Sequence, residues 1–467
     1  MAEYLKTQKG KTKLAYKGYC YVKDRNLKNG AASWICDLRY QYSCKGRIRM
    51  AADGHIEITT DHSHAPDAAR KKALQFSQAI KERAGTTHET TQHVIAECLS
   101  NINVSEAEAA RLPAVSSLKK TIRRERNRQP AIDPQPATLL ELNFRPEHLV
   151  LDDGTEFLLY DSGPALDRFL IFSTRENLAM LCRSDHWQVD GTFKVTPHPF
   201  YQLFTIHANV FEGSYPLVYA LMPGKMQENY RSLLQALTTL QPGLNPSTLM
   251  VDFEKASINA FKLQFPNLEI TGCFFHLAQC IWRQVQRHGL VTIYENEPDF
   301  ASQIKCLAAI AFLRVADVEE AFTQMTTHES WDERGNPVAD YFEDNYIGRP
   351  NRRGPRRRPL FDHDLWNVHQ RALDNSQRTN NIVEAWHRGF QTLVGPQCPN
   401  IFRFLALLQK DYSVQKLKIQ QAAAGRSPPR KRQRFEQSDN RISRILHQYE
   451  DRTLLEKLRS ISHAFEF

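Results

Sequence analysis

The sequence predicts an α+β protein of several domains, with a small β-rich module, a helical region and a larger mixed α/β region that has a helical insertion. Three observations support this prediction. Residues 13–64 form short runs rich in β-branched and aromatic residues, separated by turn pairs such as Asp53-Gly54. Residues 66–128 carry apolar residues at helical intervals, and strand-like runs alternate with helical segments from residue 185 onward. A chain of 467 residues also exceeds what one hydrophobic core organises.

The charge of the chain is concentrated in three basic clusters, at residues 119–128, 352–358 and 430–434, and the net charge is +9. Such a run alone is compatible with a solvated surface, but three of them favour a polyanionic partner such as nucleic acid. The last cluster, PPRKRQRF, also has the composition of a nuclear-localisation signal, so we expect a nuclear protein. Apolar runs such as residues 306–313 are too short to cross a bilayer, which predicts no membrane partner.

The β-rich module contains four residues of the types that bind zinc. Cys36 and Cys44 flank an expected hairpin turn, and His62 and His64 follow the last expected strand. Two thiolates and two imidazoles make a closed tetrahedral structural site for Zn²⁺. A module of this size has a small hydrophobic core, so a bound metal ion would add to its stability. The alternative is that the cysteines are buried and the histidines exposed in an ordinary small β domain.

The spacing of these residues differs from that of the finger whose helix reads the major groove, and it resembles the FLYWCH-type zinc finger. The residues that carry the resemblance are Tyr16, Tyr19, Trp34, Cys36, Cys44, His62 and His64. We place this domain at residues 8–66. Residues 67–137 follow as a helical region, in which Ser105 and Glu108 have capping-box spacing, and a proline-rich linker. The basic helix at its end is either a second DNA-contacting element or a helical spacer.

The order of elements after residue 185 predicts a mixed sheet covered by helices. Three consecutive strands, the first reaching Asp190, are followed by helix, strand, helix, strand and helix, and the fourth strand ends on Asp252. This order resembles the ribonuclease H-like fold. The resemblance implies that Asp190 and Asp252, at the ends of adjacent strands, lie side by side.

A third carboxylate, Glu384, lies in an expected helix together with His387 and Arg388, and all three project from nearly the same face. The segments VDGTFKV, LMVDFEKA, GCFFHLAQ and NNIVEAWHRGF together resemble the transposases of Mutator-like elements (MULE). We place this domain at residues 138–415. Within it, the core occupies 185–290, a helical insertion 291–375 and the glutamate-bearing helix 379–395, while 416–467 form a basic tail and a C-terminal helix.

The resemblance implies that Asp190, Asp252 and Glu384 form an Asp-Asp-Glu triad that binds two Mg²⁺ ions and cleaves and transfers DNA strands. His387 or Arg388 would hold a phosphate or the leaving group. Cys273 and His276 would bind a second zinc ion, brace the site or simply be buried. The partners implied are terminal-repeat and target DNA, and a homo-oligomer that holds two DNA ends.

Each residue of the triad also has a structural explanation. Asp190 precedes a glycine and would suit a turn, Asp252 could cap the following helix, and Glu384 has capping-box spacing from Asn381. Two further functions stay open: a transposase-derived DNA-binding protein that no longer cuts, acting as a transcription or chromatin regulator, and a different ribonuclease H-like nuclease. The tail helix would mediate self-association or pack on the core.

Overall fold

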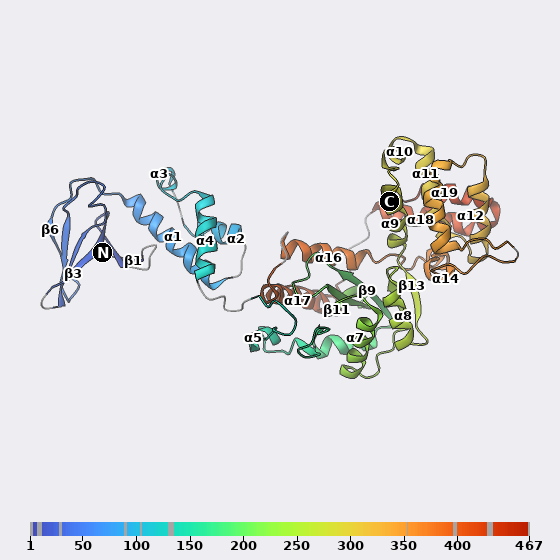
Figure 1. Ribbon diagram of the computed structural model, residues 1–467, viewed down its shortest axis with the longest axis horizontal. Helices are drawn as coiled ribbons and strands as arrows, with labels where there is room; N and C mark the ends of the chain where they lie inside the picture. Colours follow the sequence, from blue (N-terminus) through green and yellow to red (C-terminus); the bar gives the residue numbers. More distant parts are fainter. Residues whose placement is uncertain are drawn as a thin grey trace. The chain divides into compact units, whose positions relative to one another are not determined.

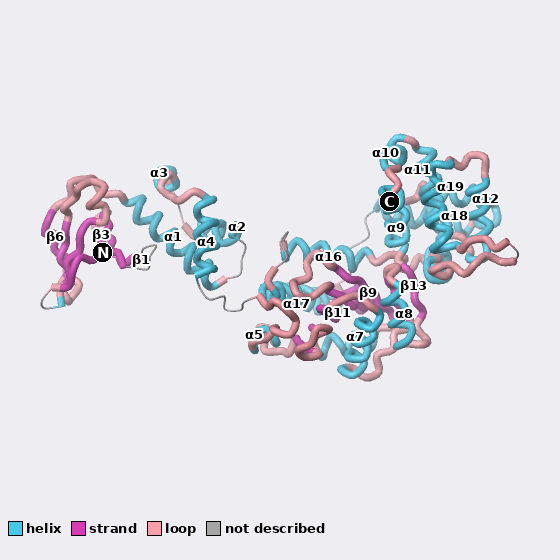
Figure 2. The backbone as a smooth tube through the Cα atoms, viewed as in Figure 1, coloured by secondary structure: helices cyan, strands magenta, loops and turns pink. Residues whose placement is uncertain are grey.

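The computed structural model describes residues 3–6, 12–27, 30–87, 91–102, 105–128, 135–352, 354–395, 399–426 and 433–465. The chain divides into two compact units, Met1–Pro134 and Gln135–Phe467, and each unit contains both strands and helices (Figure 2). The mixed α+β character expected from the sequence is therefore confirmed. Among the described residues, no helix is both long enough and apolar enough to span a membrane.

The first unit begins with a six-stranded antiparallel sheet whose strands follow one another in chain order. The strands are β1 (Glu3–Lys6), β2 (Thr12–Tyr16), β3 (Tyr19–Asn26), β4 (Ala32–Cys36), β5 (Arg47–Met50) and β6 (Ile56–Thr60). Strand β1 pairs with β2 and buries Leu5 beside Ala15 and Cys20, so the module starts before the expected boundary at residue 8. A second small core on the sheet centres on Trp34 and Ile48.

Four helices follow the sheet, as the periodicity predicted. They are α1 (Ala68–Thr86), α2 (Thr91–Ser100), α3 (Glu106–Ala109) and α4 (Val115–Arg128). Helices α1, α2 and α4 lie together (Figure 1) and share an apolar core of their own. Asp67 caps α1 with its side chain, and its backbone N–H donates to the carbonyl of Gly18. The expected capping box is present, because Ser105 and Glu108 bond reciprocally.

The second unit is built on a seven-stranded mixed sheet with the strand order β13-β12-β9-β10-β11-β8-β7. Strands β9, β10 and β11 are antiparallel neighbours, while β12 is parallel to both β9 and β13. The strands are β7 (Leu158–Asp161), β8 (Leu170–Phe172), β9 (His186–Thr192), β10 (Gln202–Val210), β11 (Gly213–Met222), β12 (Thr248–Val251) and β13 (Glu269–Gly272). The order of strands and helices predicted after residue 185 is confirmed.

Fifteen α-helices accompany this sheet in the described residues. They are α5 (Pro146–Leu149), α6 (Arg175–Arg183), α7 (Gln227–Leu240), α8 (Lys255–Gln264), α9 (Phe274–Arg287), α10 (Val291–Asn296), α11 (Pro298–Ala309), α12 (Val318–Thr327), α13 (Asn336–Phe342), α14 (His363–Trp366), α15 (His369–Leu373), α16 (Asn381–Val394), α17 (Ile401–Ala423), α18 (Gln433–His447) and α19 (Leu454–Ser462). The expected helical insertion is thus seen as α10–α15.

A tight turn at residues 151–155 is closed by backbone hydrogen bonds and an antiparallel bridge between Val150 and Glu156, and β7, which follows it, pairs with β8. One expectation about the end of this unit was wrong. The single helix expected after residue 440 is broken into α18 and α19, because Thr453 starts a new helix with a capping box to Glu456. The tail helices pack on the insertion, which favours packing over a free self-association face.

The two faces of the central sheet are distinguished by the two-residue period of its strands. On β9, the side chains of Trp187 and Val189 enter the core formed with α6, α7 and α8. Asp190 therefore belongs to the opposite face. That face is covered by α16 and α17, whose apolar residues pack against Tyr219 and Leu221 of β11 (Figure 1).

Candidate metal centre and acidic site

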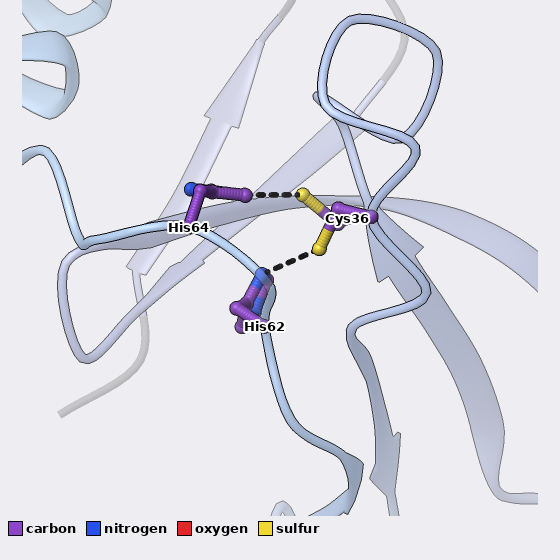
Figure 3. A group of neighbouring side chains, drawn as sticks. Cys36, His62 and His64 are labelled. Carbon is purple, nitrogen blue, oxygen red and sulfur yellow. Dashed lines mark hydrogen bonds between the residues drawn. The ribbon is translucent and has the colours of Figure 1, made fainter.

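The four zinc-type residues converge in the first unit. Cys36 ends β4, Cys44 lies in the turn before β5, and His62 and His64 follow β6. Their ligand atoms all lie within 4.8 Å of one another, and Figure 3 shows Cys36, His62 and His64 pointing toward a common centre. The predicted grouping is confirmed, and the alternative of separate buried cysteines and exposed histidines is excluded.

The distances in this cluster fit a zinc ion. The Cys36 sulfur lies 3.3 Å from Nε2 of His64, and the Cys44 sulfur lies 3.4 Å from Nδ1 of His62. With Zn–S near 2.3 Å and Zn–N near 2.1 Å, tetrahedral coordination separates a sulfur and a nitrogen by about 3.5 Å. Zinc also requires thiolates. Burial opposes ionisation of Cys44, but hydrogen bonds from the backbone of Ser63 and Gly46 lower the pKa of its thiol to about 7.

Neighbouring groups orient both imidazoles. The Nε2 atom of His62 lies 2.8 Å from the Tyr21 hydroxyl, and Nδ1 of His64 lies 3.0 Å from the carbonyl of Ala65. Tyr19 stacks on the His62 ring with 3.7 Å between the ring centroids. Partners of this kind fix the tautomer and the direction of a metal-binding histidine. The cluster is therefore a pre-formed Cys₂His₂ site suited to Zn²⁺.

In the second unit, Asp190 lies on β9 and Asp252 directly follows the parallel strand β12. The β9–β12 register pairs Trp187 with Leu249 and Gln188 with Met250. Continued by two residues, this register aligns Asp252 with Asp190. The strand topology thus brings to one edge of the sheet two carboxylates that are distant in sequence.

Helix α16 is anchored across β9 by the segment that precedes it. Gln188 donates to the side chain of Gln377, and the buried Asn380 side chain donates to the carbonyl of Val189. The backbone N–H of Asn380 in turn donates to the sulfur of Cys273. These bonds place the first turn of α16, which carries Glu384, over the face of β9 that bears Asp190.

The three predicted carboxylates share an electrostatic environment. Burial, followed by the charge of Asp190, raises the pKa of Asp252 to about 7. The same two causes raise the pKa of Glu384 to about 7, and Arg388 opposes the rise. Mutual repulsion of buried carboxylates is relieved by a divalent cation. Oε1 of Glu384 is also buried and makes no hydrogen bond, although Nε2 of His276 lies 3.4 Å from it.

The oxygen atoms of the three carboxylates do not all lie within 4.8 Å of one another. Among the described residues, the only group of three or more His, Cys, Asp or Glu ligand atoms within 4.8 Å of one another is the Cys₂His₂ cluster. Instead, two imidazoles lie against the acids. Nδ1 of His387 lies 3.1 Å from Oδ2 of Asp190, and Nε2 of His276 lies 3.4 Å from Oε1 of Glu384.

The remaining residues predicted near this site have distinct environments. Arg388 is exposed one residue beyond His387, so its guanidinium is free to meet an anion from solution. Cys273 is fully buried and begins α9, where its sulfur braces Asn380. This contact favours the bracing role over a second zinc site.

The structural alternatives for all three carboxylates lose support. Helix α8 has Glu254, not Asp252, at its N-cap. Helix α16 has Asn380 at its N-cap, and no capping box joins Asn381 to Glu384. Asp190 lies within β9 rather than in a turn. None of the three carboxylates is therefore explained by its local role in the backbone alone.

One acidic residue near the site was missed by the sequence argument. Glu254 follows Asp252 by two residues, and its carboxylate accepts a hydrogen bond from the Tyr230 hydroxyl at 3.0 Å. Burial raises its pKa, and Asp190 contributes in the same direction. The acidic spacing in LMVDFEKA was the only available signal, because the contact with Tyr230 on α7 depends on the fold.

The chain thus contains a Cys₂His₂ module and a mixed sheet with an acidic edge. Residues 186–280 match the family model of the MULE transposase domain, and residues 4–65 match that of the FLYWCH zinc finger domain. Together these matches indicate a transposase-like DNA-binding protein. The resemblance found in the sequence is confirmed for both segments. No curated protein matches the chain.

Proposed function

We propose that the chain is a DNA transposase of the Mutator-like class, in which a ribonuclease H-like core cuts and rejoins DNA with an Asp-Asp-Glu triad. The observation that carries this proposal is the placement of Asp190, Asp252 and Glu384 on β9, after β12 and on α16, three elements that contact or adjoin one another. The strand order β11-β10-β9-β12-β13 supports the ribonuclease H-like assignment. In this order β10 is antiparallel to both of its neighbours, β9 and β11, and the other adjacent pairs are parallel.

The donor set fits a hard divalent cation, because it consists of carboxylates, one of them with a buried oxygen that lacks a hydrogen bond. Asp190, Asp252 and Glu384 would hold two Mg²⁺ ions, which activate the attacking oxygen and stabilise the leaving oxygen of an in-line displacement at phosphorus. In the first step water attacks and a DNA strand is released with a 3′-hydroxyl. In the second step that hydroxyl attacks a phosphodiester of the target.

The other residues of the site would orient the reacting groups. His387 holds Asp190 through Nδ1, and His276 lies against Glu384. Arg388 is exposed beside the triad and is suited to a phosphate oxygen, since a guanidinium binds phosphate through several donors. The FLYWCH finger would supply DNA binding, and the basic composition would supply non-specific attraction.

We also propose a nuclear location and a homo-oligomer that binds two DNA ends. The nuclear location rests on the PPRKRQRF composition, whose residues 428–432 lie outside the described part of the chain. The oligomer rests on the mechanism, since joining two transposon ends to a target requires two active sites. Sedimentation with and without terminal-repeat DNA would test it.

The decisive experiment is cleavage of duplex DNA that carries the inverted repeats flanking the coding region. With Mg²⁺ or Mn²⁺, the wild-type chain should cut, while Asp190→Ala, Asp252→Asn and Glu384→Gln should not. Asp185→Asn is the matched control, because Asp185 is exposed at the opposite end of the same strand. If neither the wild type nor the variants cut but all bind the DNA, the chain is a transposase-derived binding protein and the enzymatic proposal is wrong.

A further inference from the structure

The three basic clusters of the sequence differ in what their side chains contact. In the second cluster, Arg356 pairs with Glu343 at 2.6 Å and Arg358 pairs with Asp362. Two of the five arginines of this cluster therefore have acidic partners within the fold. Most of the third cluster lies outside the described residues. In the first cluster, on helix α4, Lys120, Arg123 and Arg124 have exposed side chains within the described part of the chain.

Helix α4 has one apolar side and one basic side. Leu118 and Ile122 are buried in the core shared with α1 and α2. Lys120, Arg123 and Arg124 are exposed, and the helical period of 3.6 residues places them opposite this core. Glu125, the one acidic residue of α4, follows Leu118 by seven positions and so lies on the core side. The outer face is thus uniformly positive.

The basic residues of this outer face make no ion pair with any described residue, in contrast to those of α1. Arg70, Lys71 and Lys72 of α1 pair with Asp37, Glu3 and Glu108 at 2.9, 2.6 and 2.9 Å. Two of these pairs hold α1 to the β-rich module, and the third holds it to α3. Lys120, Arg123 and Arg124 of α4 have no such ion pair among the described residues, and a helix that served only as a spacer would not need this row of positive charge.

We propose that the outer face of α4, defined by Lys120, Arg123 and Arg124, is a second DNA-binding surface that contacts the phosphates of a duplex in addition to the zinc finger. The inference rests on the proposed function in that DNA is the ligand. A helix about 10–12 Å wide fits the major groove of B-DNA, which is about 12 Å wide. The deep and narrow major groove of A-form RNA excludes it, so duplex DNA is the partner.

Salt dependence of binding tests this surface directly. The full chain with Asp190→Asn, which prevents cutting, is titrated into a short labelled DNA duplex of mixed sequence, without added Mg²⁺, between about 50 and 200 mM salt. Lys120→Gln/Arg123→Gln/Arg124→Gln removes three charges while keeping good helix-forming residues. The slope of log affinity against log salt should become shallower by about 0.9 per lost contact, or about 3 in total. Affinity near 150 mM salt should fall by at least about tenfold.

Two control variants separate a DNA contact from a change in net charge or folding. Arg352→Gln/Arg357→Gln/Arg358→Gln removes the same charge from exposed positions of the second cluster and should change the slope by less. Arg123→Lys/Arg124→Lys keeps the charge and should retain the wild-type slope. Zinc content should stay the same in every variant.

The outcomes distinguish this inference from the proposed function. If the α4 variant keeps the parent slope, or loses no more than the second-cluster variant, the α4 surface is wrong and the transposase proposal is untouched. If duplex RNA binds as tightly as DNA and depends equally on α4, the assignment to DNA is wrong. If the chain cuts no DNA yet binds it through α4, only the enzymatic proposal fails.

Discussion

The Nδ1 atom of His387 on α16 lies 3.1 Å from the Oδ2 atom of Asp190 on β9. The other ring nitrogen, Nε2, lies 3.2 Å from the hydroxyl of Thr205 on β10. In the tautomer with the proton on Nδ1, the ring donates to the carboxylate, while the Thr205 hydroxyl donates to the backbone carbonyl of Asp190 at 3.3 Å. His387 therefore links the helix that carries Glu384 to two strands of the sheet, and it fixes the direction of the Asp190 carboxylate.

We expect His387→Ala to weaken Mg²⁺-dependent DNA cleavage by about 10- to 100-fold, as is usual when a group that orients a metal ligand is removed. Because His387 positions Asp190 rather than holding the cation, the loss should be largest at low Mg²⁺ and partly restored at high Mg²⁺. Cleavage rates measured over a series of Mg²⁺ concentrations check this. Thr205→Val, which removes the hydroxyl contacts with His387 and with the Asp190 carbonyl but keeps the imidazole, should have a smaller effect of the same kind. An equal loss at all Mg²⁺ concentrations would contradict a positioning role.

Asp252→Asn should stabilise the second unit more at pH 8 than at pH 5 when divalent ions are not added. Burial and the charge of Asp190 raise the pKa of Asp252 to about 7, so the folded protein binds this proton more tightly than the unfolded chain, where the pKa is about 3.9. The resulting stabilisation of the wild type is complete below the unfolded value and is lost as the pH rises through 7. The stabilising effect of the variant should therefore be larger at pH 8 than at pH 5 by about 3 kcal/mol, at about 1.4 kcal/mol per pH unit up to the folded pKa.

Urea unfolding followed by tryptophan fluorescence measures this difference. The signal reports mainly on the second unit, because Trp34 is the only tryptophan of the first unit. Asp185→Asn serves as the control, since Asp185 is exposed, and its effect should be the same at both pH values. A pH-independent effect of Asp252→Asn would show that burial and the charge of Asp190 do not raise the pKa of Asp252.

The sequence predicted those features that depend on local periodicity. The alternation of Trp187 and Val189 with Gln188 and Asp190 identifies a strand with one apolar face, and the order of strands and helices then constrains the sheet. The zinc cluster was predictable for the same reason, because its ligands flank strands of one small module.

Features that depend on contacts between distant segments were not predictable. Glu254 lies at the acidic site with its carboxylate hydrogen-bonded to Tyr230. His276 contacts Glu384 because α9 and α16 lie close together at this point. The pairing of β7 with β8 also joins separate segments, and it buries Leu170 and Phe172 fully in the sheet. In each case the tertiary contacts outweigh the local pattern.

Gly46→Ala should abolish tight zinc binding by the first unit. A Cβ atom at position 46 would lie 2.5 Å from Nδ1 of His62, the atom that faces the Cys44 sulfur. The imidazole would have to move away, and a tetrahedral site tolerates little displacement of a ligand. Zinc content and competition with a chelator should show at least about a tenfold loss of affinity, comparable to other changes around zinc ligands.

Gly54→Ala is the matched control for the zinc site, because nothing lies within 4 Å of the added methyl group. This variant should lose some stability, since Gly54 has a φ of +87°, but it should retain zinc. Equal zinc affinity in Gly46→Ala and the wild type would mean that His62 does not bind through Nδ1.

Gly191→Ala and Gly389→Ala should change the stability of the second unit in opposite directions. At position 191, beside Asp190, a Cβ atom would lie 2.7 Å from Oε1 of Gln202. Gln202 donates to the Tyr230 hydroxyl, which in turn donates to Glu254, so displacing Gln202 disturbs the support of the acidic site. The glycine thus accommodates a buried side chain of the protein itself, and its replacement should cost about 1–3 kcal/mol.

At position 389, in the middle of α16, an added methyl group meets no atom within 4 Å. Alanine favours a helix over glycine by about 0.8–1 kcal/mol, so Gly389→Ala should stabilise α16 and leave the placement of Glu384 intact. Urea unfolding of the two variants gives both signs in one experiment, and Mg²⁺-dependent cleavage should fall only in Gly191→Ala. A stabilised Gly191→Ala would show that Gln202 can move freely, and would remove the argument that this glycine maintains the acidic edge of the sheet.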